Sequence, residues 1–361
     1  MNKDESRTSV DREIDQILAK LTPIEYDRIL TCTKLLCDRA DLGNAGGEGA
    51  RSQAIEARIQ EMRADLQQGS SSEWLYDRVC QELRTGEIMT QTVKRIWEHR
   101  YERVPVSLKE FITSGSYLNL RIAPDDVDAK ILAALEVLFG HRITDVILAG
   151  ANLTAKSTFG ALALLYEIYL LSCMRDPAKT YGLMRGSNIT FLVLVSRQRN
   201  IECDLVSVLS HLVSSSKYFT KIFPCKYSAR SGLTCRHNIH LYSAASRQQS
   251  VLGVGVFSAF LEGFDLFPAG EGPPVGGART RRRIKKREQL LQAVRMRMTS
   301  RFNLAGKLPG HIYLSCLSPY PKEELASLRD SWPRPVHVFD DAALGIDDTA
   351  AESDDSALKI E

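Results

Sequence analysis

The sequence has no long apolar run and no charge imbalance large enough to identify a partner. None of its 361 residues lie in an apolar stretch approaching the ~18 residues that suggest a membrane span. The first residues, MNKDESRTSVDREID, are polar and acidic, unlike a secretory signal peptide. The eight cysteines are scattered, as expected of reduced thiols in a cytosol, and the net charge is only +3. We therefore expect a cytoplasmic protein that has no membrane partner.

The composition is that of a globular chain, with 44% hydrophobic and 25% charged residues. Apolar residues at helical spacing predict a small helical region over residues 1–104. Apolar strands then alternate with helices over residues 105–339, which predicts an α/β domain with a mainly parallel sheet sandwiched by helices. The strand candidates are Val146–Ala149, Ile189–Val195, Ile239–Tyr242, Val254–Leu261 and Ile312–Cys316, and the helix candidates Ser157–Met174 and Asn200–Val213. Residues 340–361 are expected to be an acidic, disordered tail.

The stretch ILAGANLTAKST, Ile147–Thr158, fits the phosphate-binding pattern G-x-x-x-x-G-K-[ST] at every defined position except one. Ala155 stands where the second glycine belongs. In such a loop, backbone N–H groups at a helix N-terminus surround the phosphates, the lysine adds positive charge, and the hydroxyl ligates Mg²⁺. The simpler alternative is an ordinary turn between a strand and a helix. The residues predicted to bind nucleotide are Gly150, Asn152, Thr154, Ala155, Lys156, Ser157 and Thr158.

A second motif is expected at the end of another buried strand, because a P-loop enzyme needs an acid near Mg²⁺ and a base for water. In VGVFSAFLEGFD, Glu262 stands at the magnesium position, so Ser157 and Glu262 are the predicted metal-side residues. Gly263 occupies the position of the catalytic glutamate and cannot act as a base, which leaves Asp265 as the candidate. Gly263→Glu should therefore raise turnover, unless Gly263 has a positive φ, where a glutamate would strain the loop.

These motifs, in this order, resemble the ATPase domain of tailed-phage terminase large subunits. The resemblance runs from about Pro105 to Pro321 and includes VSLKEFITSGSYLNL, the P-loop with its following helix, RDPAKTYGLMRGSNITFLVLVS, the Glu262 strand and RMTSRFNLAGKLPGHIYLSCLSPY. It implies a RecA/ASCE-like P-loop fold, ATP and Mg²⁺ as cofactors, and Ser315 and Cys316 at the position of the family's coupling motif. It also implies double-stranded DNA as a partner, and a homo-oligomer or an assembly with portal or other terminase components in the host cytoplasm.

The chain also departs from this family. Ala155 replaces the usual glycine, Glu262 and Gly263 replace the usual Asp-Glu pair, and Asn152 lies where some members carry an arginine. Because a short, acidic segment follows Pro321, we expect no counterpart of the family's C-terminal nuclease domain. The resemblance therefore implies a terminase-like DNA-packaging ATP hydrolase with weakened hydrolysis. The alternative is a non-catalytic nucleotide- or DNA-binding homologue that acts as a scaffold or regulator.

Two further segments have competing interpretations. The run RTRRRIKKR forms either a contact for DNA phosphates or the solvated face of a helix; its bases are Arg279, Arg281, Arg282, Arg283, Lys285, Lys286 and Arg287. The residues Cys225, Cys235, His237 and His240 form either a zinc site of uncommon spacing or, as we favour, buried thiols and surface histidines.

Overall fold

A computed structural model gives the fold. It describes residues 9–44, 59–60, 63, 71–84, 90–122, 127–140, 143–149, 153–195, 204–228, 232–245, 253–263, 278–302, 308–316 and 336–340. The chain divides into two compact units: Met1–Pro105 with Cys173–Asp176, and Val106–Ser172 with Pro177–Glu361. No helix among the described residues is long and apolar enough to cross a membrane.

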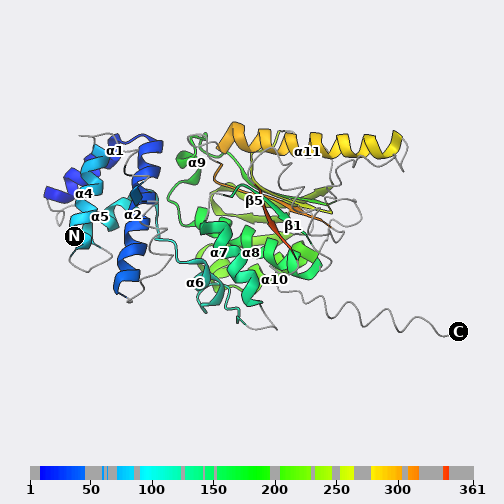
Figure 1. Ribbon diagram of the computed structural model, residues 1–361, viewed down its shortest axis with the longest axis horizontal. Helices are drawn as coiled ribbons and strands as arrows, with labels where there is room; N and C mark the ends of the chain where they lie inside the picture. The colour runs from blue at the N-terminus through cyan, green and yellow to red at the C-terminus, as the bar shows by residue number, and fades with distance from the viewer. Residues whose placement is uncertain are drawn as a thin grey trace. The chain divides into compact units, whose positions relative to one another are not determined.

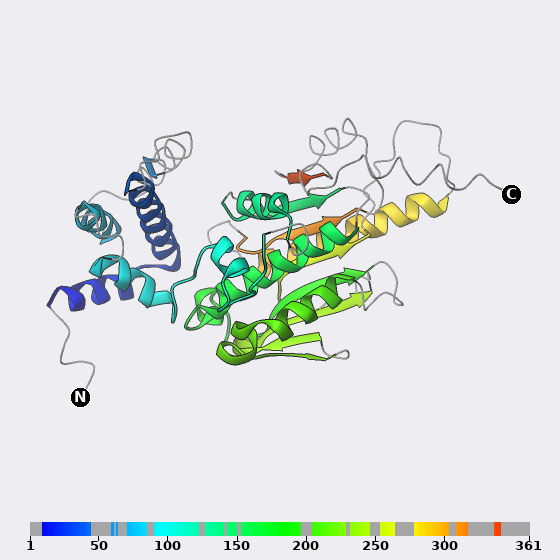
Figure 2. The same ribbon diagram turned by 90° about the horizontal axis from the view of Figure 1, so that it is seen from below.

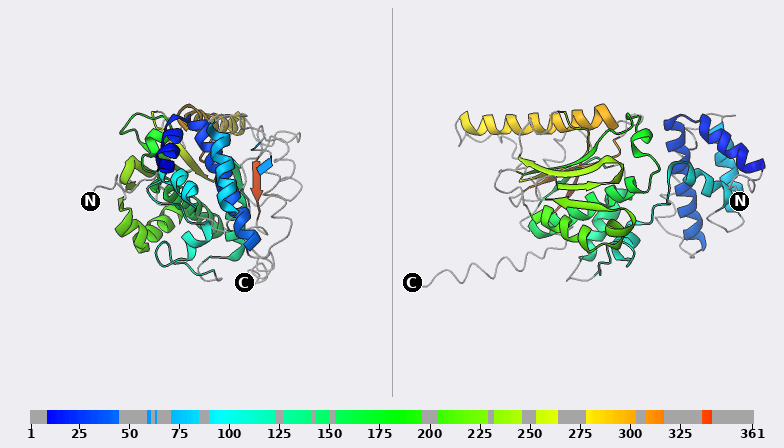
Figure 3. Two further views of the ribbon diagram at one scale, coloured as in Figure 1. Left: turned by 90° about the vertical axis from the view of Figure 1, so that its left-hand side faces the viewer. Right: turned by 180° about the vertical axis from the view of Figure 1, so that it is seen from behind.

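The first unit is helical (Figure 3, left). Its described helices are α1 (Ser9–Lys20), α2 (Pro23–Asn44), α4 (Ser71–Leu83) and α5 (Gln91–Arg100). They enclose a core in which Ile14, Ile29, Leu75 and Val93 are fully buried. The apolar spacing predicted this helical region because one stripe of each amphipathic helix faces the others.

The second unit is the predicted α/β domain, built on a mostly parallel sheet. The described strands are β1 (Asp145–Leu148), β2 (Ile189–Val195), β3 (Cys225–Ser228), β4 (Gly232–Cys235), β5 (Ile239–Ala245), β6 (Val256–Glu262), β7 (Ile312–Ser315) and β8 (Val336–Phe339). Their order is β3-β4-β5-β2-β6-β7-β1-β8, and Figure 2 shows β8 and the β3–β4 hairpin at opposite edges. Among the described strands, only β3 with β4 and β4 with β5 pair antiparallel.

Helices cover both faces of this sheet, as buried parallel strands require. The described helical segments are α6 (Leu108–Thr113), α7 (Ala129–Gly140), α8 (Leu153–Ser172), α9 (Pro177–Thr180), α10 (Asp204–Ser215), the π-helical turn η2 (Tyr218–Ile222), the 3-10 turn η3 (Arg236–Asn238) and α11 (Ala278–Phe302). Helix α11 lies on one face, and α7, α8 and α10 lie on the other (Figures 1 and 3). The fold is therefore a RecA/ASCE-like P-loop domain preceded by a small helical region.

Close packing holds α8, the helix that follows the P-loop, against the sheet. A Cβ atom on Gly160 would lie 2.4 Å from the ring of Phe260, so a larger residue there would force the helix away from β6. Most of α8 beyond Thr158 is buried, including Phe159, Leu162 and Leu165. The start of α8 is thereby fixed at the carboxyl ends of the central strands.

Candidate nucleotide site

The P-loop lies between β1 and α8, as the sequence predicted. Gly150 and Asn152 lie outside the described residues, and the side chain of Thr154 is likewise not described. Ala155 is half-buried in the first turn of α8, and Thr158, in the second turn, is also half-buried. The first turn of a helix carries N–H groups without intrahelical partners, so it offers hydrogen bonds and a positive dipole end to a phosphate.

Lys156 and Ser157, the two residues with chemical roles in the motif, are both buried. Lys156 is 1% exposed and Ser157 is 4% exposed. The Lys156 ammonium donates a hydrogen bond to the carbonyl oxygen of Cys316, the residue that directly follows β7. Burying an ammonium is costly unless it is hydrogen-bonded, so this carbonyl stabilises the lysine inside the site.

The sheet register brings the second motif to the same place. Ser315, the last residue of β7, pairs with Leu148 of β1 on one side and with Glu262 of β6 on the other. The Cys316 amide donates to the Leu148 carbonyl at 2.9 Å. The P-loop, the predicted coupling residues and the predicted magnesium-side acid therefore meet at the carboxyl ends of three adjacent strands.

The donor atoms at this edge suit Mg²⁺ held beside a nucleotide. A serine hydroxyl at position 157 and a half-buried carboxylate at position 262 are oxygen ligands, which Mg²⁺ prefers. Groups of three or more His, Cys, Asp or Glu side chains able to hold a metal do not occur among the described residues. If Mg²⁺ binds beside a nucleotide at this edge, Ser157 and Glu262 are the residues that would hold it.

The position expected for the catalytic base has an unusual backbone. Gly263 is buried and has a φ of 67°, in the left-handed region that favours glycine. A glutamate could take this conformation only with strain, so the condition for restoring a base by this one substitution is not met. Asp265, the other predicted base, lies outside the described residues.

The basic run predicted to contact DNA lies in the N-terminal half of α11. The backbone is helical from Ala278, but the side chains of Arg279, Arg281, Arg282, Arg283, Lys285, Lys286 and Arg287 are not described. From Leu290 onward the helix packs on the sheet through Leu291, Val294 and Met298. The acidic tail beyond Asp340 also lies outside the described residues.

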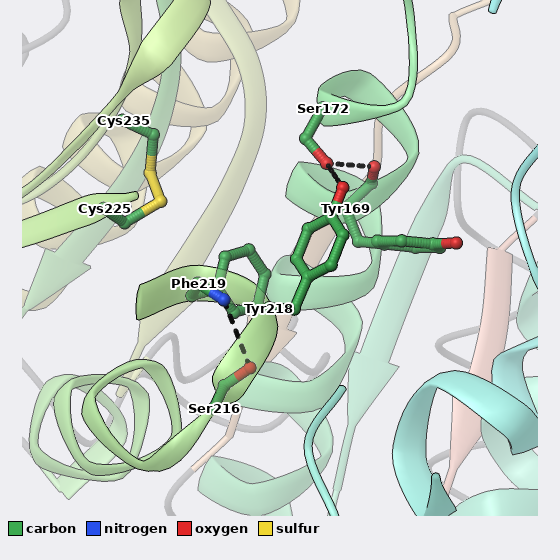
Figure 4. The surroundings of a disulfide bond; sticks show 7 residues. All are labelled: Tyr169, Ser172, Ser216, Tyr218, Phe219, Cys225 and Cys235. Carbon is green, nitrogen blue, oxygen red and sulfur yellow. Dashed lines mark hydrogen bonds between the residues drawn. A yellow bond between two sulfur atoms is a disulfide. The ribbon is translucent and has the colours of Figure 1, made fainter. Parts of the chain in front are cut away.

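The zinc interpretation and the prediction of free thiols are both wrong for Cys225 and Cys235. These two residues are register partners on β3 and β4 and form a disulfide (Figure 4). Sulfur atoms bonded to each other cannot ligate zinc as thiolates. His237 instead stacks on the ring of Phe223, with 5.6 Å between the ring centroids.

A buried polar cluster that was not predicted from the sequence joins α8 to β7. Glu167 is 3% exposed, accepts a hydrogen bond from the Tyr313 hydroxyl at 2.9 Å and contacts Nδ1 of His311. Burial, followed by the nearby Glu167 carboxylate, raises the pKa of Tyr313 well above its ordinary value. The signal was present in the sequence, because Glu167 is the one charged residue in the apolar run from Ser157 to Met174.

Three comparisons with known proteins bear on this site. The family model described as "Uncharacterized protein MJ0330, N-terminal P-loop domain" matches residues 68–313, more than half of the chain. No curated protein matches the chain. Among solved structures, the chain is similar to the large terminase ATPase domain of Thermus phage P74-26, with 8% identity and a TM-score of 0.37, covering 57% of this chain and 79% of that one. A superposition this loose supports no conclusion about function.

Proposed function

The chain belongs to the family of the MJ0330 N-terminal P-loop domain, and we propose on that basis that it binds ATP with Mg²⁺. From the terminase-like segments of the sequence we further propose that it acts as a terminase-like DNA-packaging ATPase. One observation carries the nucleotide part of this proposal. Lys156 and Ser157 lie side by side near the N-terminus of α8, at the strand edge where Glu262 ends β6. A cation, a hydroxyl, a carboxylate and a helix N-terminus then face the same bound triphosphate and its metal.

Titration calorimetry with ATP and Mg²⁺ tests nucleotide binding. Lys156→Ala removes the ammonium that meets the terminal phosphates. Because binding exchanges its hydrogen bond to the Cys316 carbonyl for a charge-assisted one, a net gain of about 1–2 kcal/mol, affinity should fall roughly 5- to 30-fold. Lys130→Ala is the matched control, because Lys130 is an exposed lysine on α7. The proposal fails if the wild-type protein does not bind ATP at millimolar nucleotide.

The packaging part of the proposal is supported by the terminase-like segments between Pro105 and Pro321 and by the basic run in α11. A motor that moves a polyanion needs cations that contact its phosphates. When the logarithm of the affinity for duplex DNA is plotted against the logarithm of the salt concentration, the slope should be about −0.9 for each phosphate neutralised. Alanine at Arg281, Arg282 and Arg283 should flatten that slope. We further propose that the chain works as a homo-oligomer or with portal or other terminase components, which light scattering of the purified assembly would test.

A second candidate function is a non-catalytic homologue that binds nucleotide or DNA as a scaffold or regulator. The left-handed glycine at position 263 favours it, because the site lacks the usual glutamate and its backbone disfavours one. An assay of phosphate release from ATP distinguishes these two candidate functions. A packaging ATPase should hydrolyse ATP faster when duplex DNA is added, whereas a regulator should bind ATP without DNA-stimulated turnover.

A further inference from the structure

One continuous stretch of the second unit contains basic residues but no acidic ones. The stretch from Leu205 to Leu261 contains no Asp or Glu, although 44 of the 361 residues are acidic. This stretch forms most of α10 and all of η2, β3, β4 and β5. Its Lys and Arg residues are Lys217, Lys221, Lys226, Arg230, Arg236 and Arg247.

Four of these bases gather around the β3–β4 hairpin, which forms one edge of the sheet. Lys217 immediately precedes η2, Lys221 lies within it, Lys226 is in β3, and Arg236 directly follows β4. All four are exposed. Figure 2 shows this hairpin at the edge of the sheet opposite β8. We call these four residues with their supporting backbone the hairpin edge.

The backbone that carries the hairpin edge is firmly anchored. The Tyr218 hydroxyl lies 2.7 Å from Ser172 Oγ on α8, and the ring of Phe219 is fully buried beneath η2 (Figure 4). The disulfide between Cys225 and Cys235 ties β3 to β4. The four cations are therefore displayed on a preorganised surface, which lowers the entropy lost when a ligand binds.

The charges of the hairpin edge are not neutralised within the described part of the protein. None of Lys217, Lys221, Lys226 and Arg236 forms an ion pair with a described carboxylate. Among them stand two partly exposed apolar side chains, Ile222 and Tyr227, at 40% and 38% exposure. Cations gathered without counter-charge repel one another and attract a polyanion, whose condensed counterions they displace.

We propose that the hairpin edge contacts the phosphate backbone of duplex DNA. This inference rests on the DNA-binding part of the proposed function and adds a surface separate from the basic run of α11. Six strand intervals separate β3 from β1, so at ~4.8 Å per strand the hairpin edge lies on the order of 30 Å from the P-loop strand. DNA at this edge would therefore not compete with the nucleotide for space.

Fluorescence anisotropy with a labelled 30-base-pair duplex, measured over a range of salt concentrations, tests the proposal. The double variant Lys221→Ala/Lys226→Ala should lower the log–log salt slope by about 1.8 and weaken binding about 30-fold at 0.15 M salt, because two phosphate contacts are lost. The control Lys109→Ala/Lys130→Ala removes the same charge from exposed positions on α6 and α7 and should bind like wild type.

Each outcome decides the question. If wild type binds DNA and the Lys221/Lys226 variant has an unchanged slope, the hairpin edge is not a contact surface, although DNA binding stands. If wild type does not bind the duplex at 0.05 M salt, both the DNA part of the proposed function and this inference fail, while calorimetry still tests ATP binding separately. Thermal melting checks that each variant is folded. If the Lys221/Lys226 variant melts at a lower temperature than wild type, Lys217→Ala/Arg236→Ala provides an independent test, with the same expected decrease in slope.

Discussion

Substituting glutamate for Gly263 should destabilise the protein and should not restore hydrolysis. At negative φ this change would supply the missing base, a role typically worth ~10²–10⁴-fold in rate. At the observed φ of 67°, however, any Cβ atom crowds the following carbonyl oxygen, at a cost of about 1–2 kcal/mol. Either the turn keeps its conformation and loses that much stability, or it relaxes and displaces the end of β6, where Glu262 lies.

The assay compares three variants by urea unfolding and by phosphate release. Gly263→Ala and Gly263→Glu should each lower the free energy of unfolding by about 1–2 kcal/mol, because both add a Cβ atom. Gly263→Asn should lower it less, since asparagine tolerates the left-handed region better than other side chains. Turnover of Gly263→Glu should stay at the wild-type level or below. A Gly263→Glu protein with wild-type stability and at least tenfold faster turnover would refute the reasoning.

Three further predictions concern stability. Glu167→Gln should lower the free energy of unfolding by about 1–3 kcal/mol in chemical denaturation, because it leaves buried His311 without its carboxylate partner. Cys225→Ser, or reduction of the bond to Cys235, should lower the free energy of unfolding by about 3 kcal/mol in the same assay, because it releases a short covalent loop. Wild type under reductant should then be as stable as the variant. Although burial raises the pKa of Glu82, hydrogen bonds from neighbouring threonines outweigh burial and hold that pKa below its ordinary value of 4.5. The stability that Glu82 contributes should therefore be full above pH 4.5 and fall as the pH drops further. Glu82→Gln should flatten this pH dependence.

The central strands could be predicted from the sequence because both of their faces are buried. Every residue of β2 is buried, so the run ITFLVLV is apolar apart from Thr190 and its bounds can be read directly. The strands β6 and β7 lie close to their predicted positions for the same reason. Strand β5 also lies close to its predicted position, although His240 and Tyr242 are only half-buried. Their shared carboxyl edge follows from parallel pairing, which is why Lys156, Ser315 and Glu262 could be expected near one another.

The edges of the sheet could not be predicted because their strands lack that apolar signal. In β3, the last three of four residues are exposed, and CKYS has no apolar alternation. In β8, the short segment VHVF is mostly half-buried, and Pro335 precedes it immediately. Both strands form because a neighbouring strand offers hydrogen bonds. The disulfide was missed for a related reason: two cysteines ten residues apart can bond only where a hairpin register places them opposite each other.

The contact between Lys156 and the Cys316 carbonyl links nucleotide binding to the end of β7. A bound phosphate needs the same ammonium, so binding exchanges a hydrogen bond to a neutral carbonyl for one to a charged oxygen. The first is worth about 0.5–1.5 kcal/mol and the second about 1.5–3 kcal/mol, so the net gain is small. When the lysine moves, Cys316 loses that donor, although its amide still donates to Leu148. If phosphate binds as proposed, we expect it to be sensed at Cys316, one of the two residues that the terminase resemblance placed at the coupling position.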